Sequence, residues 1–112
     1  MTFLEALKKA EGQGRIPVIA DIKCRSPKEG DLLAGRDPVE LAWQLAAAGA
    51  PVLSVVTEAK EFGGSPELLR RLSSEVPVPF LRKDFLSSRQ DLIETKEAGA
   101  SAVLLMYSTL GR

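Results

Sequence analysis

Two lysines and a carboxylate stand where two strand-like segments end. The apolar segment 18–23 closes with Asp21 and Lys23, and the alternation of side chains along a strand places these two on one face. The segment 78–83 ends in Lys83. Lysine ammonium groups bind carboxylate or phosphate, and they donate protons to reacting groups. The pattern predicts an anion site with acid chemistry; the alternative is that the lysines are only solvated and that Asp21 is a structural partner of Lys23.

The composition argues against several other chemistries. The chain has no histidine and a single cysteine, Cys24, so the usual Ser-His and Cys-His pairs and the commonest metal ligand are absent, and we expect no metal. A lone cysteine cannot form an internal disulfide, which favours a cytoplasmic location. Basic and acidic residues number 15 each, which gives no electrostatic case for nucleic acid or an anionic membrane as a partner. No apolar run is long enough to cross a bilayer, and residues 1–12 do not resemble a signal peptide.

Helix-like and strand-like segments alternate along the chain, and we expect a single domain over residues 1–112. Apolar residues at helical spacing predict a short helix over 3–11, with Thr2 as N-cap and Glu5 completing a capping box. Strands are predicted at 18–23, 52–56, 78–83 and 102–106. Three more helices are predicted, from Asp37 to Gly49, from Ser65 to about Ser73, and from Ser88 to Ala98. Residues 24–36 are predicted to be a polar loop.

A short internal repeat supports this order of elements. The sequence Ala-Gly-Ala occurs at 48–50 and again at 98–100, 50 residues later, and each copy precedes an apolar strand. Apolar strands that alternate with helices indicate a parallel sheet covered by helices, either an open doubly wound sheet or part of a TIM barrel. A complete barrel has eight strands and roughly 250 residues. From the residues alone both folds stay open: an open sheet, or a parallel (β/α) half-barrel with about four βα units of a TIM barrel preceded by a short N-terminal helix.

The residues around the predicted strand ends resemble one known family. Ile-Ala-Asp-Ile-Lys-Cys-Arg-Ser-Pro at 19–27, Ser-Val-Val-Thr-Glu at 54–58 and Leu-Arg-Lys-Asp-Phe at 81–85 resemble the strand signatures of the indole-3-glycerol-phosphate synthases. The segment 98–105 resembles the approach to the family's fourth strand. The resemblance covers essentially the whole chain in order, and the motifs are specific when taken together.

The resemblance implies the half-barrel fold and a carbon–carbon lyase of tryptophan biosynthesis. The family closes the indole ring of 1-(2-carboxyphenylamino)-1-deoxyribulose 5-phosphate with loss of carbon dioxide and water, and needs no cofactor or metal. Lys83 matches the family's general acid, Lys23 matches the lysine that holds the substrate near its carboxylate, and Asp21 occupies a third catalytic position. The substrate-binding residues that the resemblance implies are Ser26, Ser54, Val56, Phe62, Phe85 and Leu104.

Two positions depart from the family pattern. Asp21 stands where the family has glutamate, so the carboxylate reaches about 1.5 Å less far, one carbon–carbon step; a displacement near 1 Å can cost about a hundredfold in rate. Lys28 stands where the family has a small residue. The family's second half supplies another catalytic glutamate, an asparagine and most of the phosphate cradle, so we expect the isolated 112-residue chain to be nearly inactive.

Two other interpretations stay open at this stage. The chain is alternatively a non-catalytic half-barrel that retains an anion site and pairs through its strand edges, either with itself or with a complementary half-barrel. Native mass together with a synthase assay separates this interpretation from the first. A different phosphate-binding barrel, such as phosphoribosylanthranilate isomerase, is the third, and the long loop that carries Ser26 and Pro27 argues against it.

Overall fold

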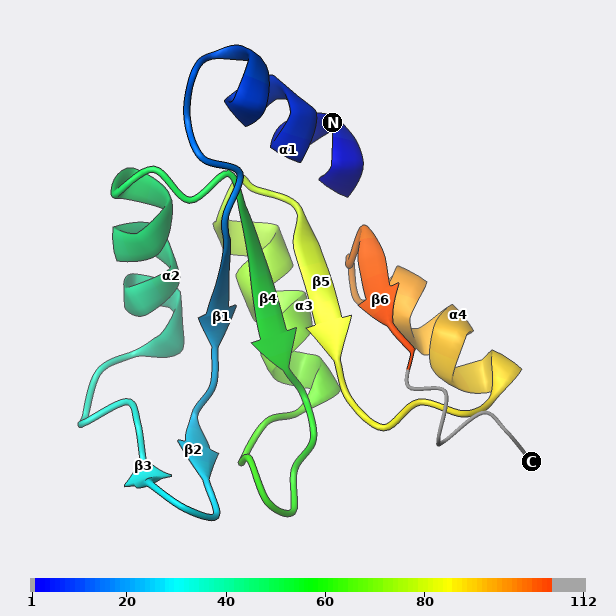
Figure 1. Cartoon of the computed structure of the whole chain (residues 1–112). Helices are drawn as coiled ribbons and strands as arrows, with labels where there is room; N and C mark the ends of the chain where they lie inside the picture. The colour runs from blue at the N-terminus through cyan, green and yellow to red at the C-terminus, as the bar shows by residue number, and fades with distance from the viewer. Residues whose placement is uncertain (1, 106–112) are drawn as a thin grey trace.

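A four-stranded parallel sheet forms the centre of the computed structural model, which describes residues 2–105 (Figure 1). Its strands are β1 (Ile19–Ile22), β4 (Val52–Val56), β5 (Phe80–Lys83) and β6 (Ala102–Leu104), in the spatial order β1-β4-β5-β6. Each strand therefore pairs with the next long strand of the chain, without the reversal of strand order that defines a doubly wound sheet. Parallel strands joined in sequence by helices are the arrangement of a (β/α) barrel, and four strands are half of its eight. The predicted half-barrel is confirmed.

Three helices connect the strands of this sheet, and a fourth precedes them. They are α1 (Phe3–Gly12), α2 (Pro38–Ala47), α3 (Pro66–Glu75) and α4 (Arg89–Glu97). The predicted capping box of α1 is present: the Glu5 backbone N–H donates to the Thr2 hydroxyl, and the Thr2 N–H donates to the Glu5 carboxylate. The Ser65 and Ser88 hydroxyls cap α3 and α4, each accepting from the backbone N–H of the third residue of its helix, and α4 also has the reciprocal bond of a capping box. Figure 1 shows α1 at the end of the sheet where the strands begin.

The structure differs from the sequence prediction in two local features. The predicted polar loop contains a small antiparallel hairpin, β2 (Arg25–Ser26) and β3 (Gly30–Asp31), which the pattern did not predict because its strands are too short to show alternation. Asp37 stands at the N-cap position of α2 but makes no capping hydrogen bond. Its carboxylate instead pairs with Arg71 of α3, 2.8 Å from Nη2.

The predicted limits of the first and third strands were also too wide, whereas the strand predicted at 52–56 is confirmed. The first strand begins at Ile19 and the third at Phe80, each after the predicted start, and the first ends at Ile22, before Lys23. The fourth strand ends at Leu104; the predicted end, Met106, lies outside the described residues.

The hydrophobic core lies between the sheet and the helices that cover one of its faces. Alternate residues of the strands point into it, and these are fully or almost fully buried with side chains of α2 and α3. The buried strand residues of this cluster are Ile22, Leu53, Val55 and Phe80. The intervening residues occupy the opposite face, and they include the candidate site residues that lie in this sheet: Asp21, Ser54, Val56, Lys83 and Leu104. In the part of the chain that the structure describes, no helix combines the length and apolar character needed to span a membrane.

The capping box of α4 makes a testable contribution to stability. The Ser87 backbone N–H, followed by the N–H and hydroxyl of Ser88, holds the pKa of Asp91 below the ordinary 3.8. A carboxyl group with a lower pKa in the folded protein than in the unfolded chain stabilises the fold at pH values above its pKa in the unfolded chain. This contribution is lost as the pH falls through the pKa that the group has in the folded protein. We predict that Ser88→Ala lowers the free energy of unfolding at pH 7 by about 1 kcal/mol.

Urea denaturation at pH 7 and at successively lower pH measures this effect. The destabilisation by Ser88→Ala should become smaller as the pH falls through the folded pKa of Asp91. Ser87→Ala is the matched control, because Ser87 contributes its backbone N–H to Asp91. Equal stability of Ser88→Ala and the wild type at pH 7 would contradict the prediction.

Candidate functional site

The parallel register brings the candidate residues into two neighbouring rows across the sheet. In one row Asp21 of β1 is the Cα partner of Ser54 of β4, which is the partner of Leu81 of β5. In the row nearer the carboxyl ends, Lys83 lies between Val56 and Leu104. Residues two apart in a strand share a face, so both rows belong to the face opposite the helices.

A cavity of about 290 Å³ opens at the carboxyl ends of the strands. Half of its eight lining side chains are apolar, and two are lysines from different strand ends. Six of the nine predicted site residues lie here. The lining consists of Lys23, Val56, Glu58, Phe62, Lys83, Asp84, Phe85 and Leu104. The Lys23 ammonium lies 5.6 Å from the centroid of the Phe62 ring, close enough for a cation–π interaction.

Asp21 stands beside this cavity and pairs with Lys83, not with Lys23. The Asp21 Oδ2 lies 3.6 Å from the Lys83 Nζ, and both side chains are about one-third exposed, 30% and 37%. The Ser54 hydroxyl donates to the other carboxylate oxygen at 2.5 Å. Asp21 therefore links β4 and β5, and its hydrogen bond with Ser54 fixes the carboxylate next to the ammonium of Lys83.

Ser26 lies apart from the cavity. Its side chain is in the β2–β3 hairpin, where the hydroxyl accepts from the Glu29 backbone N–H at 2.9 Å. The residue is buried, with 8% of its surface exposed. In this structure the hydroxyl stabilises the turn of the hairpin, and the contact of Ser26 with substrate stays a prediction.

Arg25 connects the hairpin to the loop after β4, which carries Phe62. The Arg25 N–H donates to the Phe62 carbonyl oxygen at 3.2 Å. Its guanidinium donates to the carbonyl oxygens of Ala59 and Lys60, at 3.2 and 2.9 Å. These bonds hold the loops after β1 and β4 together, and so hold the Phe62 ring near Lys23.

Two acidic residues, Glu58 and Asp84, also line the cavity. The sequence interpretation did not assign them to the site. The Glu58 carboxylate accepts from the Glu61 backbone N–H at 3.0 Å. The Asp84 carboxylate accepts from the Phe85 N–H and from the Thr57 hydroxyl, both at 2.7 Å. Each acid stands within two positions of the carboxyl end of a strand, and in (β/α) folds that place alone is a signal of function.

Cys24 does not have the environment of a nucleophile. Burial raises the pKa of its thiol, and the nearby Asp31 carboxylate raises it further, so the neutral thiol predominates at neutral pH. Within residues 2–105 there is also no cluster of three or more Cys, Asp or Glu side chains that could hold a metal ion.

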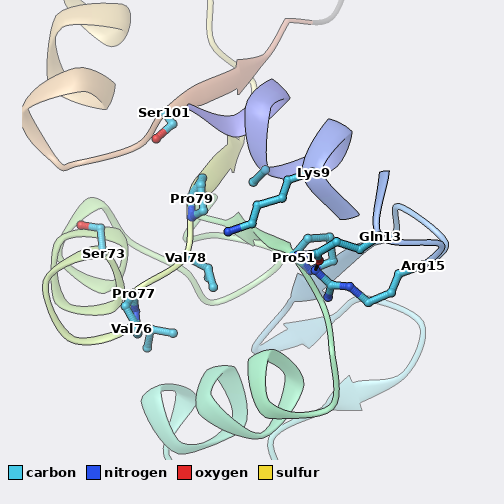
Figure 2. A pocket seen from close by; sticks show the side chains of 11 residues that line it. Lys9, Gln13, Arg15, Pro51, Ser73, Val76, Pro77, Val78, Pro79 and Ser101 are labelled. Atoms are coloured by element: carbon cyan, nitrogen blue, oxygen red, sulfur yellow. Dashed lines mark hydrogen bonds between the residues drawn. The ribbon is translucent and has the colours of Figure 1, made fainter. Parts of the chain in front are cut away.

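A larger cavity, of about 540 Å³, lies at the amino ends of the strands, next to α1 (Figure 2). Its basic side chains are Lys9 and Arg15. Arg15 already donates to the Gly49 carbonyl oxygen and to the Gln13 side chain, at 3.2 and 2.6 Å. None of the predicted site residues lines this cavity, and the catalytic sites of (β/α) barrels lie at the opposite, carboxyl end.

The fold and the smaller cavity define a class of protein: a (β/α)-barrel protein whose carboxyl-end pocket combines two lysines with aromatic walls. The family model described as "Indole-3-glycerol phosphate synthase" matches residues 1–112. The chain belongs to the indole-3-glycerol phosphate synthase family.

Relatives named indole-3-glycerol phosphate synthase give the extent of the similarity. The protein of Thermococcus kodakarensis is 48% identical, over 94% of this chain and 45% of the relative. That of Pyrococcus furiosus is 46% identical over the same shares. That of a Nocardioides species is 48% identical over 83% of this chain and 36% of the relative. The chain thus spans less than half the length of these relatives.

Gly64 offers a test of how closely the loop after β4 packs on the strand. A Cβ at this position would overlap the Val56 carbonyl oxygen and lie 2.7 Å from the Thr57 Cα. Backbone atoms cannot move away as a flexible side chain can. We predict that Gly64→Ala destabilises the fold by roughly 1–3 kcal/mol, as overpacking does, in chemical denaturation.

Gly12→Ala is the matched control, because a Cβ on Gly12 meets nothing within 4 Å. This variant should unfold at the same denaturant concentration as the wild type or at a slightly higher one, because Gly12 is the last residue of α1 and alanine favours the helix more than glycine. A Gly64→Ala protein as stable as the Gly12→Ala protein would refute the close packing of the loop.

Proposed function

We propose that this chain carries the lysine-bearing half of an indole-3-glycerol-phosphate synthase active site. The reaction is the decarboxylating ring closure of 1-(2-carboxyphenylamino)-1-deoxyribulose 5-phosphate, a step of tryptophan biosynthesis that needs no cofactor and takes place in the cytoplasm. The observation that carries the proposal is that Lys23 and Lys83, from separate strand ends, line one cavity with Phe62 and Phe85.

The cavity suits the carboxyphenyl part of this substrate. Phe62, Phe85 and Leu104 offer apolar surface to an aromatic ring, and aromatic pairs prefer offset or edge-to-face contacts. The Lys23 ammonium lies over the Phe62 ring, so a ring bound against Phe62 would bring its carboxylate within reach of Lys23. A volume of about 290 Å³ accommodates the ring and its carboxylate, and the ribulose phosphate would extend beyond the described lining.

Lys83 is proposed as the general acid of the ring closure. As the new carbon–carbon bond forms, the substrate's carbonyl oxygen gains negative charge, and a proton from the ammonium neutralises it. Loss of carbon dioxide leaves its bonding electron pair in the benzene ring and restores its aromaticity. The new hydroxyl group then takes a second proton and leaves as water, while the adjacent CH₂ carbon loses one proton to form the double bond of the indole ring. Asp21, 3.6 Å from Nζ and bonded to Ser54, would hold the ammonium in place beside the cavity between turnovers.

Mixing the chain with the unmatched C-terminal part of a full-length relative tests this function. We predict that the pair forms indole-3-glycerol phosphate, measured by indole fluorescence, and that Lys83→Met lowers the rate by about 10²–10⁴-fold, the usual contribution of a general acid. Lys96→Met is the control, since Lys96 lies on the surface of α4. An unchanged rate in Lys83→Met would refute the assignment.

Anthranilate binding to the chain alone gives a second measurement that does not need the complementary part. In NMR titration, anthranilate should shift the amide signals of Phe62, Phe85 and Leu104, and Lys23→Met should weaken binding. Absence of these shifts in the wild-type chain would contradict the proposed ring site.

The strand edges favour a second proposed property, pairing with another chain. Among residues 2–105, β1 pairs on one side only, with β4, and β6 pairs only with β5. Ile19 and Leu104, which belong to these edge strands, are 48% and 43% exposed. Open edges expose unpaired N–H and C=O groups that bind a further strand. We propose that a second copy or a complementary half-barrel covers them.

Light scattering after gel filtration tests the pairing. We predict a native mass of at least two chains for the isolated protein, and a shift toward the monomer in Ile19→Lys, because a charge on an edge strand opposes strand addition. Ile16→Lys is the control: Ile16 is 80% exposed but precedes β1. A monomeric wild type over a wide range of concentrations would exclude self-association.

A further inference from the structure

A buried arginine lies directly behind the candidate general acid. Arg82 precedes Lys83 in β5, so its side chain points to the opposite face of the sheet, toward the helices. Only 4% of this side chain is exposed. Burying a guanidinium is unfavourable unless hydrogen bonds and opposite charges compensate, and so its partners indicate what Arg82 holds in place.

The partners of Arg82 come from the loops after β4 and β5 and from α4. Its Nε donates to the Thr57 hydroxyl oxygen at 2.9 Å. Its Nη1 donates to the Thr95 hydroxyl oxygen at 3.0 Å and lies 2.9 Å from a carboxylate oxygen of Glu94. Its Nη2 lies 3.6 Å from the Asp84 Oδ2. Arg82 thus joins Thr57 and Asp84, which directly follow β4 and β5, to helix α4.

The same contacts continue to the wall of the cavity. Thr57 donates its hydroxyl hydrogen to Asp84 at 2.7 Å, while its oxygen accepts from Arg82. The other oxygen of Asp84 accepts from the backbone N–H of Phe85 at 2.7 Å. Asp84 and Phe85 both line the cavity, and the Thr57 N–H donates to the Lys83 carbonyl oxygen at 3.0 Å.

We propose that Arg82 is a positioning residue for the candidate site. Through Thr57 it fixes the Asp84 carboxylate, and through Asp84 it fixes the Phe85 backbone, so that the aromatic wall and the backbone of Lys83 keep one arrangement. Arg82 itself does not touch the cavity. The consequence for ligand binding rests on the proposed function; the consequence for the Phe85 backbone does not.

Thr57→Val is the sharpest test, because valine keeps the shape of threonine and removes the hydroxyl that joins Arg82 to Asp84. In amide hydrogen exchange by NMR, the Phe85 N–H should exchange roughly tenfold faster or more, since losing a hydrogen bond to a charged group shifts a local opening by that order. The core amide of Leu53 should be much less affected. Thr57→Ser, which retains the hydroxyl, should restore the wild-type behaviour at Phe85.

Arg82→Met completes the series, with Arg70→Met on the exposed surface of α3 as its control. We expect Arg82→Met to accelerate amide exchange at Phe85 as Thr57→Val does. If Arg82→Met does not fold, Thr57→Val alone still tests the proposal. Equal acceleration at Phe85 and Leu53 in Thr57→Val would mean a purely structural role and would overturn the proposal. Unchanged exchange at Phe85 would do the same.

Anthranilate titration of the same variants separates the two proposals. The positioning role predicts weaker anthranilate binding in Thr57→Val, with binding restored in Thr57→Ser. A wild-type chain that binds no anthranilate would refute the proposed function, while the exchange rates at Phe85 would still decide whether Arg82 positions the wall.

Discussion

The register between β4 and β5 determines which charged groups face the cavity and which face the core. Val56 pairs with Lys83, and Val55 pairs with Arg82. A slip of one residue would turn every side chain of β5 to the other face. Lys83 would then enter the core away from Asp21, and Arg82 would leave its buried partners. The cost of separating the buried arginine from its acids therefore opposes the slip, and the same contacts keep the candidate general acid on the open face.

The two faces of β5 carry two charge networks with different tasks. Behind the sheet, Arg82 is buried, and its rigid fork of donors is occupied by hydroxyl groups and carboxylates, the use for which arginine is better suited than lysine. On the cavity side, Lys83 is 37% exposed and pairs with Asp21. A long flexible ammonium in this setting is held near its carboxylate but can still turn toward a ligand. The fixed contacts of Arg82 thus hold β5 in place, while the Lys83 side chain on the other face stays able to turn toward a ligand.

Local sequence was enough to predict the alternating strands and helices of a parallel sheet, the capping of α1 by Thr2, and the placing of Lys23 and Lys83 near the ends of two strands. Each of these depends on a pattern within a few residues, whereas the choice of the half-barrel over an open sheet came from the resemblance to the family. The pairing of Asp21 with Lys83 was not predictable in this way, because β4 separates their strands and the sequence favoured Lys23 as the neighbour. The same holds for the bond of Thr57 to Asp84, whose partners lie 27 residues apart. Contacts of this kind follow from register and packing.

The resemblance predicts glutamate at position 21, and the shorter side chain of Asp21 has a specific consequence in this geometry. Because Asp21 and Ser54 are Cα partners, even the shorter carboxylate reaches the hydroxyl, and Lys83 spans the remaining distance with its own four-carbon stem. The resulting N···O separation of 3.6 Å exceeds the usual hydrogen-bond length of about 2.7–3.2 Å. Electrostatic attraction therefore holds the ammonium near Asp21 without a tight hydrogen bond. The hydrogens of the ammonium stay available to an oxygen in the cavity, which is the requirement for a proton donor.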